Sequence, residues 1–335
     1  MEQAVRSVRM ERARFGIDLG GTKIALAALD HEGRVLLRRR VPTPRGDYHA
    51  TVEAIARLVA AAESELGVAA SIGVGTPGAP SRVDGLMKNC NSVVLNGRPL
   101  AADLEARLGR PLRIANDADC FALSEANDGA ARGARVVFGV ILGTGVGGGI
   151  VVDGRLLHGP NSIAGEWGHN GLPWPRPDEL PGPPCYCGRS GCLETWLSGP
   201  ALARGLMGSD TGLMGSDTIS PAPARATAPA VPAADAADAV AVVRRAQAGD
   251  ADAAAALDAW FDRLARGLAM VINILDPDAI VLGGGLSGID ATYAEVPRRW
   301  RRHVFSDRVD TALLRPAHGD DSGVLGAARL WPAPE

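Results

Sequence analysis

Residues 14–41 read RFGIDLGGTKIALAALDHEGRVLLRRRV, and this stretch decides the fold. Apolar runs around 13–19, 23–30 and 33–41 are separated by the turn residues GG and HEG, so they predict three consecutive β-strands. A similar stretch, RVVFGVILGTGVGGGIVVDGRLL, occupies residues 135–157 and predicts the same succession of strands and turns. The chain is therefore expected to contain a duplicated β-meander followed by α/β units, and not a simple doubly wound sheet.

Alternating helices and strands are predicted after each meander. In the first half, apolar spacing predicts helices over 49–67, 100–109 and 117–131 and buried strands over 70–78 and 111–117. In the second half, it predicts helices over 236–249, 251–275, 290–303 and 322–331 and a buried strand over 278–285. Residues 205–218 repeat the unit GLMGSDT, and we expect a low-complexity surface insertion over about 205–235.

Composition and charge argue against several classes of protein. The chain has 335 residues, 46% of them hydrophobic, which is enough for a substantial core in one large or two ordinary domains. The formal charge of −3 and the pI of about 6.1 do not suggest a nucleic-acid partner, which more often requires a basic face. No apolar run approaches the roughly 20 residues of a membrane span or forms a signal-peptide core, so we expect no membrane association and a cytoplasmic protein.

Three glycine-rich turns each follow an apolar strand. Glycine leaves backbone N–H groups unobstructed for phosphate, although tight hairpins use the same residues. None of the turns is a Walker A loop, because the chain contains no GKS or GKT. Asp18, at the end of the first strand, is a candidate Mg²⁺ ligand or simply a turn-capping residue. The turn residues are Gly20, Gly21, Thr22 and Lys23, then Gly143, Thr144 and Gly145, and finally Gly283, Gly284 and Gly285.

Asn116 and Asp117 lie where a predicted strand meets a predicted helix. Strand ends in α/β folds are where clefts form, so this carboxylate is a candidate general base. The spacing also fits an N-cap pair for the following helix, and on the spacing alone the capping role is favoured.

The segment CYCGRSGC, residues 185–192, holds three of the five cysteines, and GEWGH precedes it at 165–169. Such a cluster argues for a local site and against a disulfide framework. A redox pair and a metal site are both compatible with the spacing, although a third cysteine suits thiol exchange poorly. Cys90 and Cys120 are isolated, and we expect them to be buried and inert.

Four motifs in this order, GIDLGGTK, ANDA, GEWGH and CYCGRSGCLE, resemble the signatures of the ROK family of bacterial sugar kinases and repressors. The resemblance extends from Phe15 to the end of the chain. It implies an actin-like, hexokinase-related ATPase fold: a duplicated βββαβα arrangement of two domains around a cleft. The resemblance is closest to the fructokinase branch, on the segments PTPRGDY, NCNSVVLNGRPL, AGEWGHNGLPW, NILDPDAIVLGGG and HGDDSGVLGAARLW.

The resemblance implies the reaction and its residues. ATP would phosphorylate the 6-hydroxyl of a hexose, D-fructose first among them, with Mg²⁺ as cofactor. It favours Asp117 as the general base and Asn116 as a ligand of neighbouring hydroxyls, in place of the capping role. The other sugar-binding residues that it implies are Asn91, Glu166, His169 and Glu194. The first two glycine turns would meet the phosphates from two sides, with Gly283, Gly284 and Gly285 bordering the nucleoside.

The resemblance also favours zinc over a redox pair at the cysteine cluster. Cys185, Cys187 and Cys192 supply three thiolates and His169 a fourth ligand, a set suited to a closed tetrahedral Zn²⁺ site. A closed shell cannot activate water, so we expect a structural role for the metal. Zinc on one nitrogen of His169 would leave the other to meet a sugar hydroxyl.

The expected domains are residues 1–118 with 315–335, and residues 119–314. The active site is expected in the cleft between them, and family members are often homodimers. A glucokinase, a mannokinase and an N-acetylhexosamine kinase are alternatives of the same class, and a catalytically silent binding protein is another. A sugar-responsive transcriptional regulator is disfavoured, because only 17 residues precede Asp18 and a helix-turn-helix domain needs more.

Overall fold

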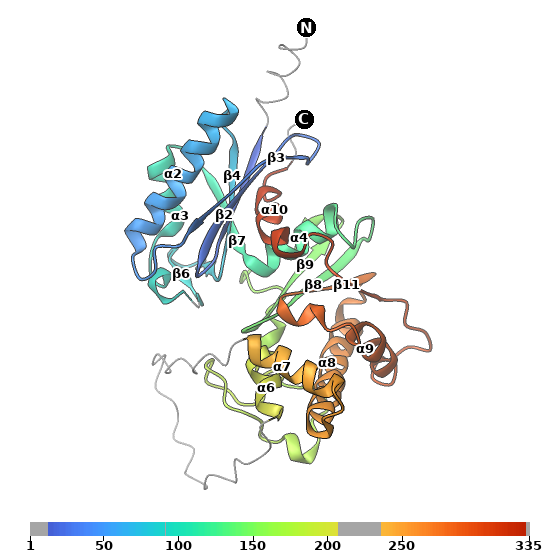
Figure 1. Ribbon diagram of the computed structural model, residues 1–335. Coiled ribbons are helices and arrows are strands. Elements are labelled where there is room, and N and C mark those ends of the chain that lie inside the picture. Colours follow the sequence, from blue (N-terminus) through green and yellow to red (C-terminus); the bar gives the residue numbers. More distant parts are fainter. Residues whose placement is uncertain (1–12, 91, 207–235, 333–335) are drawn as a thin grey trace. The chain divides into compact units, whose positions relative to one another are not determined.

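The computed structural model describes residues 13–90, 92–206 and 236–332 (Figure 1). The chain divides into two compact units. The first comprises Met1–Gly139, Gly149–Gly165 and Pro316–Glu335, and the second comprises Val140–Gly148 and Glu166–Arg315. The domain boundary expected at residue 118 falls inside the first unit and stays a prediction. Asn91 and most of the expected insertion at 205–235 lie outside the described residues.

The first sheet contains the predicted meander and two further strands. Its order is β3-β2-β1-β4-β7, in which β1 pairs antiparallel with β2 and parallel with β4. Two helices connect the later strands, α2 between β3 and β4 and α3 between β4 and β7. The bounds are β1 Arg14–Leu19, β2 Lys23–Leu29, β3 Val35–Pro42, α2 Tyr48–Leu66, β4 Ser71–Thr76, α3 Leu100–Leu108 and β7 Leu112–Asn116.

The two faces of this sheet are packed differently. On β2, side chains alternate between the faces, so Ile24 and Leu26 join the core beneath α2 and α3 while Ala25 and Ala27 face α10, Ser322–Ala328 (Figure 1). The α10 side is lined by small residues. A Cβ at Gly16 would overlap the carbonyl oxygen of Val324, so glycine is required for this close approach.

The second sheet repeats the order of the first. Its strands run β10-β9-β8-β11-β12, so each five-stranded sheet places its own third, second, first, fourth and fifth strand, counted along the chain, side by side. Helix α8 precedes β11 and helix α9 precedes β12, just as α2 precedes β4 and α3 precedes β7 in the first half. The duplication is therefore confirmed. The bounds are β8 Val136–Leu142, β9 Val146–Val152, β10 Arg155–Leu156, α8 Ala251–Leu275, β11 Ala279–Gly283, α9 Thr292–Trp300 and β12 Ala312–Leu314.

The remaining elements are mostly short, except for two predicted helices. Helix α4, Asp117–Asn127, follows β7, and α7, Ala236–Gln247, precedes α8. The sequence did not predict the remaining short elements, because they are too short for hydrophobic periodicity to reveal them. These are β5 Ala79–Pro80, β6 Met87–Lys88, α5 Glu194–Leu197 and α6 Gly199–Leu206, with 3₁₀ turns at Val93–Leu95, Trp167–His169, Pro177–Glu179, Gly285–Gly288 and Gly319–Asp321.

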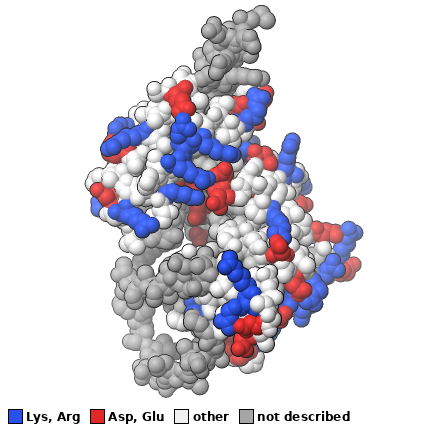
Figure 2. Space-filling model, viewed as in Figure 1, with Lys and Arg blue, Asp and Glu red and all other residues white. Residues whose placement is uncertain are grey.

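The surface in Figure 2 mixes the two signs of charge, with blue and red side chains interspersed on the face shown. Many of them are paired. Asp321, for example, accepts a hydrogen bond from Arg40 at 2.6 Å. Among the described residues, no helix combines the length and the apolar composition that crossing a bilayer requires.

Candidate active site and metal centre

The turn between β1 and β2 holds the first group of predicted phosphate-binding residues. The N–H of Gly20 donates to the carbonyl of Lys23 at 3.0 Å, which closes the turn, and Gly21 and Thr22 are exposed at its tip. Burial raises the pKa of the Asp18 carboxyl, while the charges of Lys23 and Arg40 act in the opposite direction. A carboxylate at this depth would gain from a bound cation, which fits the predicted Mg²⁺ site.

The C-terminal segment adds two neighbours of this turn that the sequence reasoning missed. A Cβ at Gly323 would lie 3.5 Å from the carboxyl carbon of Asp18, so the start of α10 faces that carboxylate. The ammonium group of Lys23 lies 3.9 Å from a carboxylate oxygen of Asp320. The motif HGDDSG could have suggested a site, but nothing in its spacing links it to a turn about 300 residues away in the sequence.

Asn116 and Asp117 lie at the junction of β7 and α4. Asn116 is the N-cap of α4, and its side-chain oxygen accepts a hydrogen bond from the N–H of Ala118 at 2.9 Å. Asp117 is the first residue of the helix, and its Oδ1 accepts from the same N–H at 2.8 Å. The capping role of Asn116 is therefore confirmed, and the base role of Asp117 stays a prediction.

The turn between β8 and β9 carries the second group, Gly143, Thr144 and Gly145. The N–H of Gly143 donates to the carbonyl of Gly145 at 3.0 Å. The next N–H, that of Val146, donates at 2.9 Å to Glu194, which begins α5. The structure thus places a predicted sugar-binding carboxylate against the predicted phosphate-binding turn. Burial is the main cause of the raised pKa of Glu194, and the charge of Glu166 adds to it.

The third glycine turn lies at the end of β11. Gly283 ends the strand and Gly285 begins a 3₁₀ turn. Between them, Gly284 has a φ of 77°, and a Cβ there would overlap the backbone of Leu142 at the end of β8. Tight packing alone therefore explains Gly284, and a contact with the nucleoside stays a prediction.

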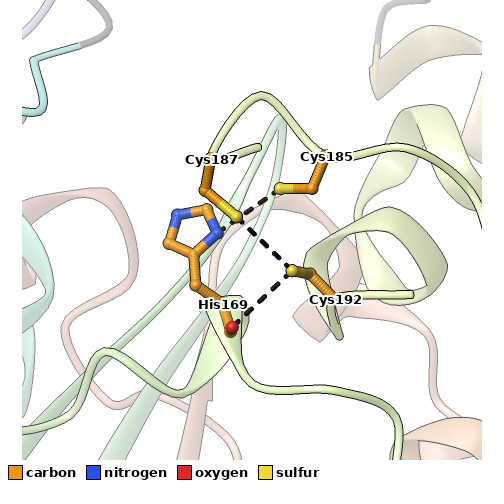
Figure 3. Close-up of side chains that lie close together, drawn as sticks. All are labelled: His169, Cys185, Cys187 and Cys192. Carbon is orange, nitrogen blue, oxygen red and sulfur yellow. Dashed lines mark hydrogen bonds between the residues drawn. The ribbon is translucent and has the colours of Figure 1, made fainter. Parts of the chain in front are cut away.

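Four side chains converge at the predicted metal centre, as Figure 3 shows. His169, Cys185, Cys187 and Cys192 each offer a ligand atom, and these atoms all lie within 4.8 Å of one another. Nδ1 of His169 lies 3.5 Å from Sγ of Cys185, and the sulfurs of Cys187 and Cys192 are 3.6 Å apart. Tetrahedral bonds of about 2.0 to 2.3 Å separate nitrogen and sulfur ligands by roughly 3.5 to 3.8 Å. The four residues therefore fit a zinc ion.

The cysteine loop turns tightly enough to bring its ligands together. The N–H of Cys185 donates to the carbonyl of Arg189 at 2.7 Å, and Gly188 and Gly191 adopt φ values of 88° and 72°. Only glycine takes such values without strain. Burial raises the pKa of Cys185 to about 12, so a metal ion would be needed to hold that sulfur as thiolate at neutral pH.

The outer nitrogen of His169 has a neighbour in the cysteine loop, and its contact with a sugar stays a prediction. Its Nε2 lies 2.9 Å from the hydroxyl of Tyr186, a residue that the sequence reasoning did not single out. The position of Tyr186 between two metal-site cysteines was the available signal.

Comparison with known proteins identifies the family. Residues 14–333 match the ROK family. The chain belongs to the ROK family. It is 38% identical over 321 residues to the N-acetyl-D-glucosamine kinase of Salmonella gallinarum, a match that covers 94% of this chain and 98% of that protein.

Two solved ROK structures resemble the chain over nearly its whole length. The ROK hexokinase from Thermus thermophilus is 32% identical with a TM-score of 0.77, and the match covers 94% of this chain and 96% of that one. The ROK family glucokinase from Streptomyces griseus, solved with glucose and AMPPNP, is 29% identical with a TM-score of 0.69. This match covers 95% of this chain and 98% of that one. The predicted actin-like α/β fold class is thereby confirmed.

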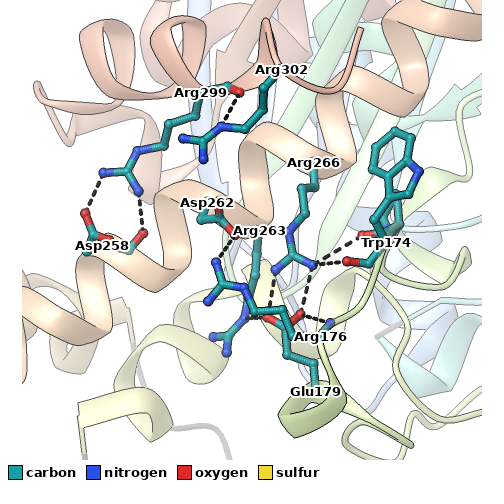
Figure 4. A network of polar contacts seen from close by, with 10 residues as sticks. Trp174, Arg176, Glu179, Asp258, Asp262, Arg263, Arg266, Arg299 and Arg302 are labelled. Atoms are coloured by element: carbon teal, nitrogen blue, oxygen red, sulfur yellow. Dashed lines mark hydrogen bonds and ion pairs between the residues drawn. The ribbon is translucent and has the colours of Figure 1, made fainter. Parts of the chain in front are cut away.

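In this ROK protein, a buried ion network fastens the segment before the cysteine loop to α8 (Figure 4). Glu179 accepts hydrogen bonds from Arg266 at 2.8 and 2.7 Å and from Arg263 at 2.9 Å. Arg266 also donates to the carbonyl of Trp174 at 2.9 Å. Burial alone would raise the pKa of Glu179, but these hydrogen bonds outweigh it and lower the pKa to about 2.

The second unit of the ROK chain therefore brings together Glu194, the second glycine turn and, in one cluster, the four metal-site residues. The first unit carries Asp18, the first glycine turn, Asn116 and Asp117. Glu166 immediately precedes the 3₁₀ turn that ends at His169, and its side chain is exposed.

Proposed function

We propose that this ROK-family protein is an ATP-dependent sugar kinase that transfers the γ-phosphoryl group of ATP to the 6-hydroxyl of a hexose. The observation that carries the proposal is the 38% identity with an N-acetyl-D-glucosamine kinase over 94% of the chain. Phosphoryl transfer asks the protein mainly for positioning and charge neutralisation, together with a carboxylate that receives the hydroxyl proton. Groups of these kinds are present in the first two glycine turns and in Asp117, which begins helix α4.

In this proposal, Asp117 removes the proton of the 6-hydroxyl and Asn116 binds a neighbouring hydroxyl. Glu166 and Glu194 hold the rest of the sugar, because carboxylates accept hydrogen bonds from adjacent hydroxyls, and Nε2 of His169 contacts a further hydroxyl in place of Tyr186. Gly20, Gly21, Thr22 and Lys23 on one turn, and Gly143, Thr144 and Gly145 on the other, bind the phosphates, and Asp18 holds Mg²⁺ through water.

Zinc would be held by Cys185, Cys187, Cys192 and His169, where it supplies structural cross-linking between the loop and the 3₁₀ turn of His169. The spacing of the four ligand atoms, all within 4.8 Å, supports this assignment. The cytoplasmic location and the homodimeric state stay predictions.

Two hexoses are the leading candidates for the substrate. The motif resemblance favours D-fructose, and the relative from Salmonella gallinarum favours N-acetyl-D-glucosamine. A coupled assay of ADP release across fructose, N-acetylglucosamine, glucose and mannose will distinguish them. We expect one of the first two to give the highest kcat/KM, and we expect its 6-deoxy analogue to release no ADP above background. ADP release that no sugar stimulates would overturn the proposal.

A further inference from the structure

Glu125 is a fully buried carboxylate that the proposed mechanism does not use. Its side chain is 0% exposed and lies near the C-terminal end of α4. Burying a carboxylate is unfavourable unless protein groups replace the hydrogen bonds that water would make. The groups that bind Glu125 therefore show what it holds in place.

The carboxylate binds a segment from the far end of the chain. Its Oε2 accepts hydrogen bonds from the N–H groups of Ala130 and Ala317, each at 2.9 Å. Its Oε1 accepts from the N–H of His318 at 3.2 Å and from the hydroxyl of Ser322 at 2.8 Å. Three of these four donors lie in or directly before the HGDDSG segment, residues 318–323. Glu125 thus ties this segment to α4.

The HGDDSG segment in turn contacts the first glycine turn. Gly323 directly follows Ser322, and a Cβ on Gly323 would lie 3.5 Å from the carboxyl carbon of Asp18. A carboxylate oxygen of Asp320 lies 3.9 Å from the ammonium group of Lys23. The contacts with Glu125 and the contacts with the turn are therefore made by neighbouring residues of one short segment.

The segment is too short to fix its own position. It consists of the 3₁₀ turn Gly319–Asp321 and the first two residues of α10. On the side of β3, Asp321 pairs with the half-exposed side chain of Arg40 at 2.6 Å, and exposed pairs contribute little. Buried hydrogen bonds to a charged group contribute more. We therefore expect Glu125 to decide where the segment lies.

We propose that Glu125 is a positioning residue for the phosphate site, because it holds the HGDDSG segment where Gly323 faces Asp18 and Asp320 faces Lys23. The inference rests on the proposed function, in which Asp18 serves Mg²⁺ and Lys23 a phosphate. Glu125 acts through the segment and touches neither reactant. Asp117 lies more than two turns earlier on α4, so hexose binding should not depend on Glu125.

The variant Glu125→Gln tests the inference. It keeps the volume of the side chain, but its NH₂ group cannot accept the hydrogen bonds that one carboxylate oxygen accepts. At a temperature where the variant is fully folded, we expect two quantities to rise about threefold to tenfold, the effect of losing one hydrogen bond. These are the KM for MgATP and the Mg²⁺ concentration that gives half the maximal rate. The KM for the hexose should stay unchanged.

Glu179→Gln is the matched control. It changes a carboxylate that is 1% exposed in the second unit, so it should lower the stability and leave both MgATP and Mg²⁺ dependence unchanged. Ser322→Ala removes one of the four hydrogen bonds and serves if Glu125→Gln does not fold. It should raise the same two quantities by a smaller factor. Calorimetric titration with MgADP, without sugar, will show the same order of affinities independently of turnover.

Three results would overturn the inference and leave the kinase proposal intact. The first is a folded Glu125→Gln or Ser322→Ala enzyme with the KM for MgATP of the wild type. The second is an equal rise in the KM for the hexose, and the third is the same loss of MgATP affinity in Glu179→Gln. A wild type that phosphorylates no sugar would instead overturn the proposed function, and the MgADP titration would still test Glu125.

Discussion

Asp117 follows the capping Asn116 directly, so one helix terminus carries both side chains. We expect Asp117→Asn to lower turnover about a hundredfold or more, because an amide cannot accept the hydroxyl proton. ATP binding, measured by calorimetry, should stay within about twofold, since the amide oxygen can still accept the N–H of Ala118. Asp252→Asn removes an exposed carboxylate from the first turn of α8 and should have no effect. A fully active Asp117→Asn enzyme would refute the assignment of the base.

Glu179 carries a buried charge that should contribute to stability. Its side chain is 1% exposed and that of Arg266 is 3% exposed. Because its pKa of about 2 lies below the ordinary 4.5, the pair contributes fully above about pH 4.5 and is lost as the pH falls toward 2. Glu179→Gln should lower the free energy of unfolding at pH 7 by about 3 kcal/mol.

Urea denaturation of the wild type and Glu179→Gln will measure this difference, which should narrow as the pH is lowered from about 5 to about 3. Glu65→Gln is the control, since its pair with Arg39 is exposed on both sides and should contribute less than about 1 kcal/mol. Equal stability of the wild type and Glu179→Gln at pH 7 would show that the buried ion network does not stabilise the fold.

Helices α4 and α10 pack together so closely that their contact excludes a side chain. A Cβ at Gly326 would overlap the carbonyl oxygen of Cys120. We expect Gly326→Ala to destabilise the protein by about 3 kcal/mol, because the helices must separate. Gly205→Ala on α6 is the matched change, since its Cβ would meet Cβ of Ala256 at an ordinary 3.6 Å, and it should be neutral or slightly stabilising. Thermal unfolding will compare the two, and similar midpoints would show that the helices adjust.

The cysteine loop is the element that depends on a metal ion. Elemental analysis should find about one zinc ion per chain, the content of a single four-ligand site. Cys192→Ser should lose most of the metal and lower the midpoint of thermal unfolding, since three ligands bind zinc more weakly than four. Cys90→Ala changes a buried thiol outside the cluster and should keep the metal. Wild-type protein that contains no zinc and unfolds at the same temperature as Cys192→Ser would contradict the assignment of the metal site.

For the whole molecule, the segment between α6 and α7 should be dispensable. Its repeats and its Ala/Pro-rich composition offer little to pack against a core. Replacing residues 207–232 by a short Gly/Ser linker should leave sugar phosphorylation and the thermal midpoint nearly unchanged. Loss of activity without loss of folded protein would show that the segment has a functional role.

Much of this molecule could be predicted from local pattern. The meanders and the capping Asn116 each depend on residues close together in the sequence, whereas His169 was grouped with the three cysteines on the family resemblance. The approach of Gly323 to Asp18 could not be predicted, because it brings the two ends of the chain together. Likewise the contact of Tyr186 with His169 could not be predicted, although Tyr186 lies between two metal-site cysteines, since this contact appears only when the loop folds back.

Helix α10 has a consequence for the order of assembly. It covers one face of the first sheet, and Leu325 and Ala328 pack against Ala27 and Leu29 of β2. On the ribosome, β2 emerges long before these residues, so the nascent chain must hold that apolar face uncovered until α10 has been synthesised. Translation that stops before residue 316 would release a polypeptide with this face still bare, and such a fragment should be captured by chaperones and degraded.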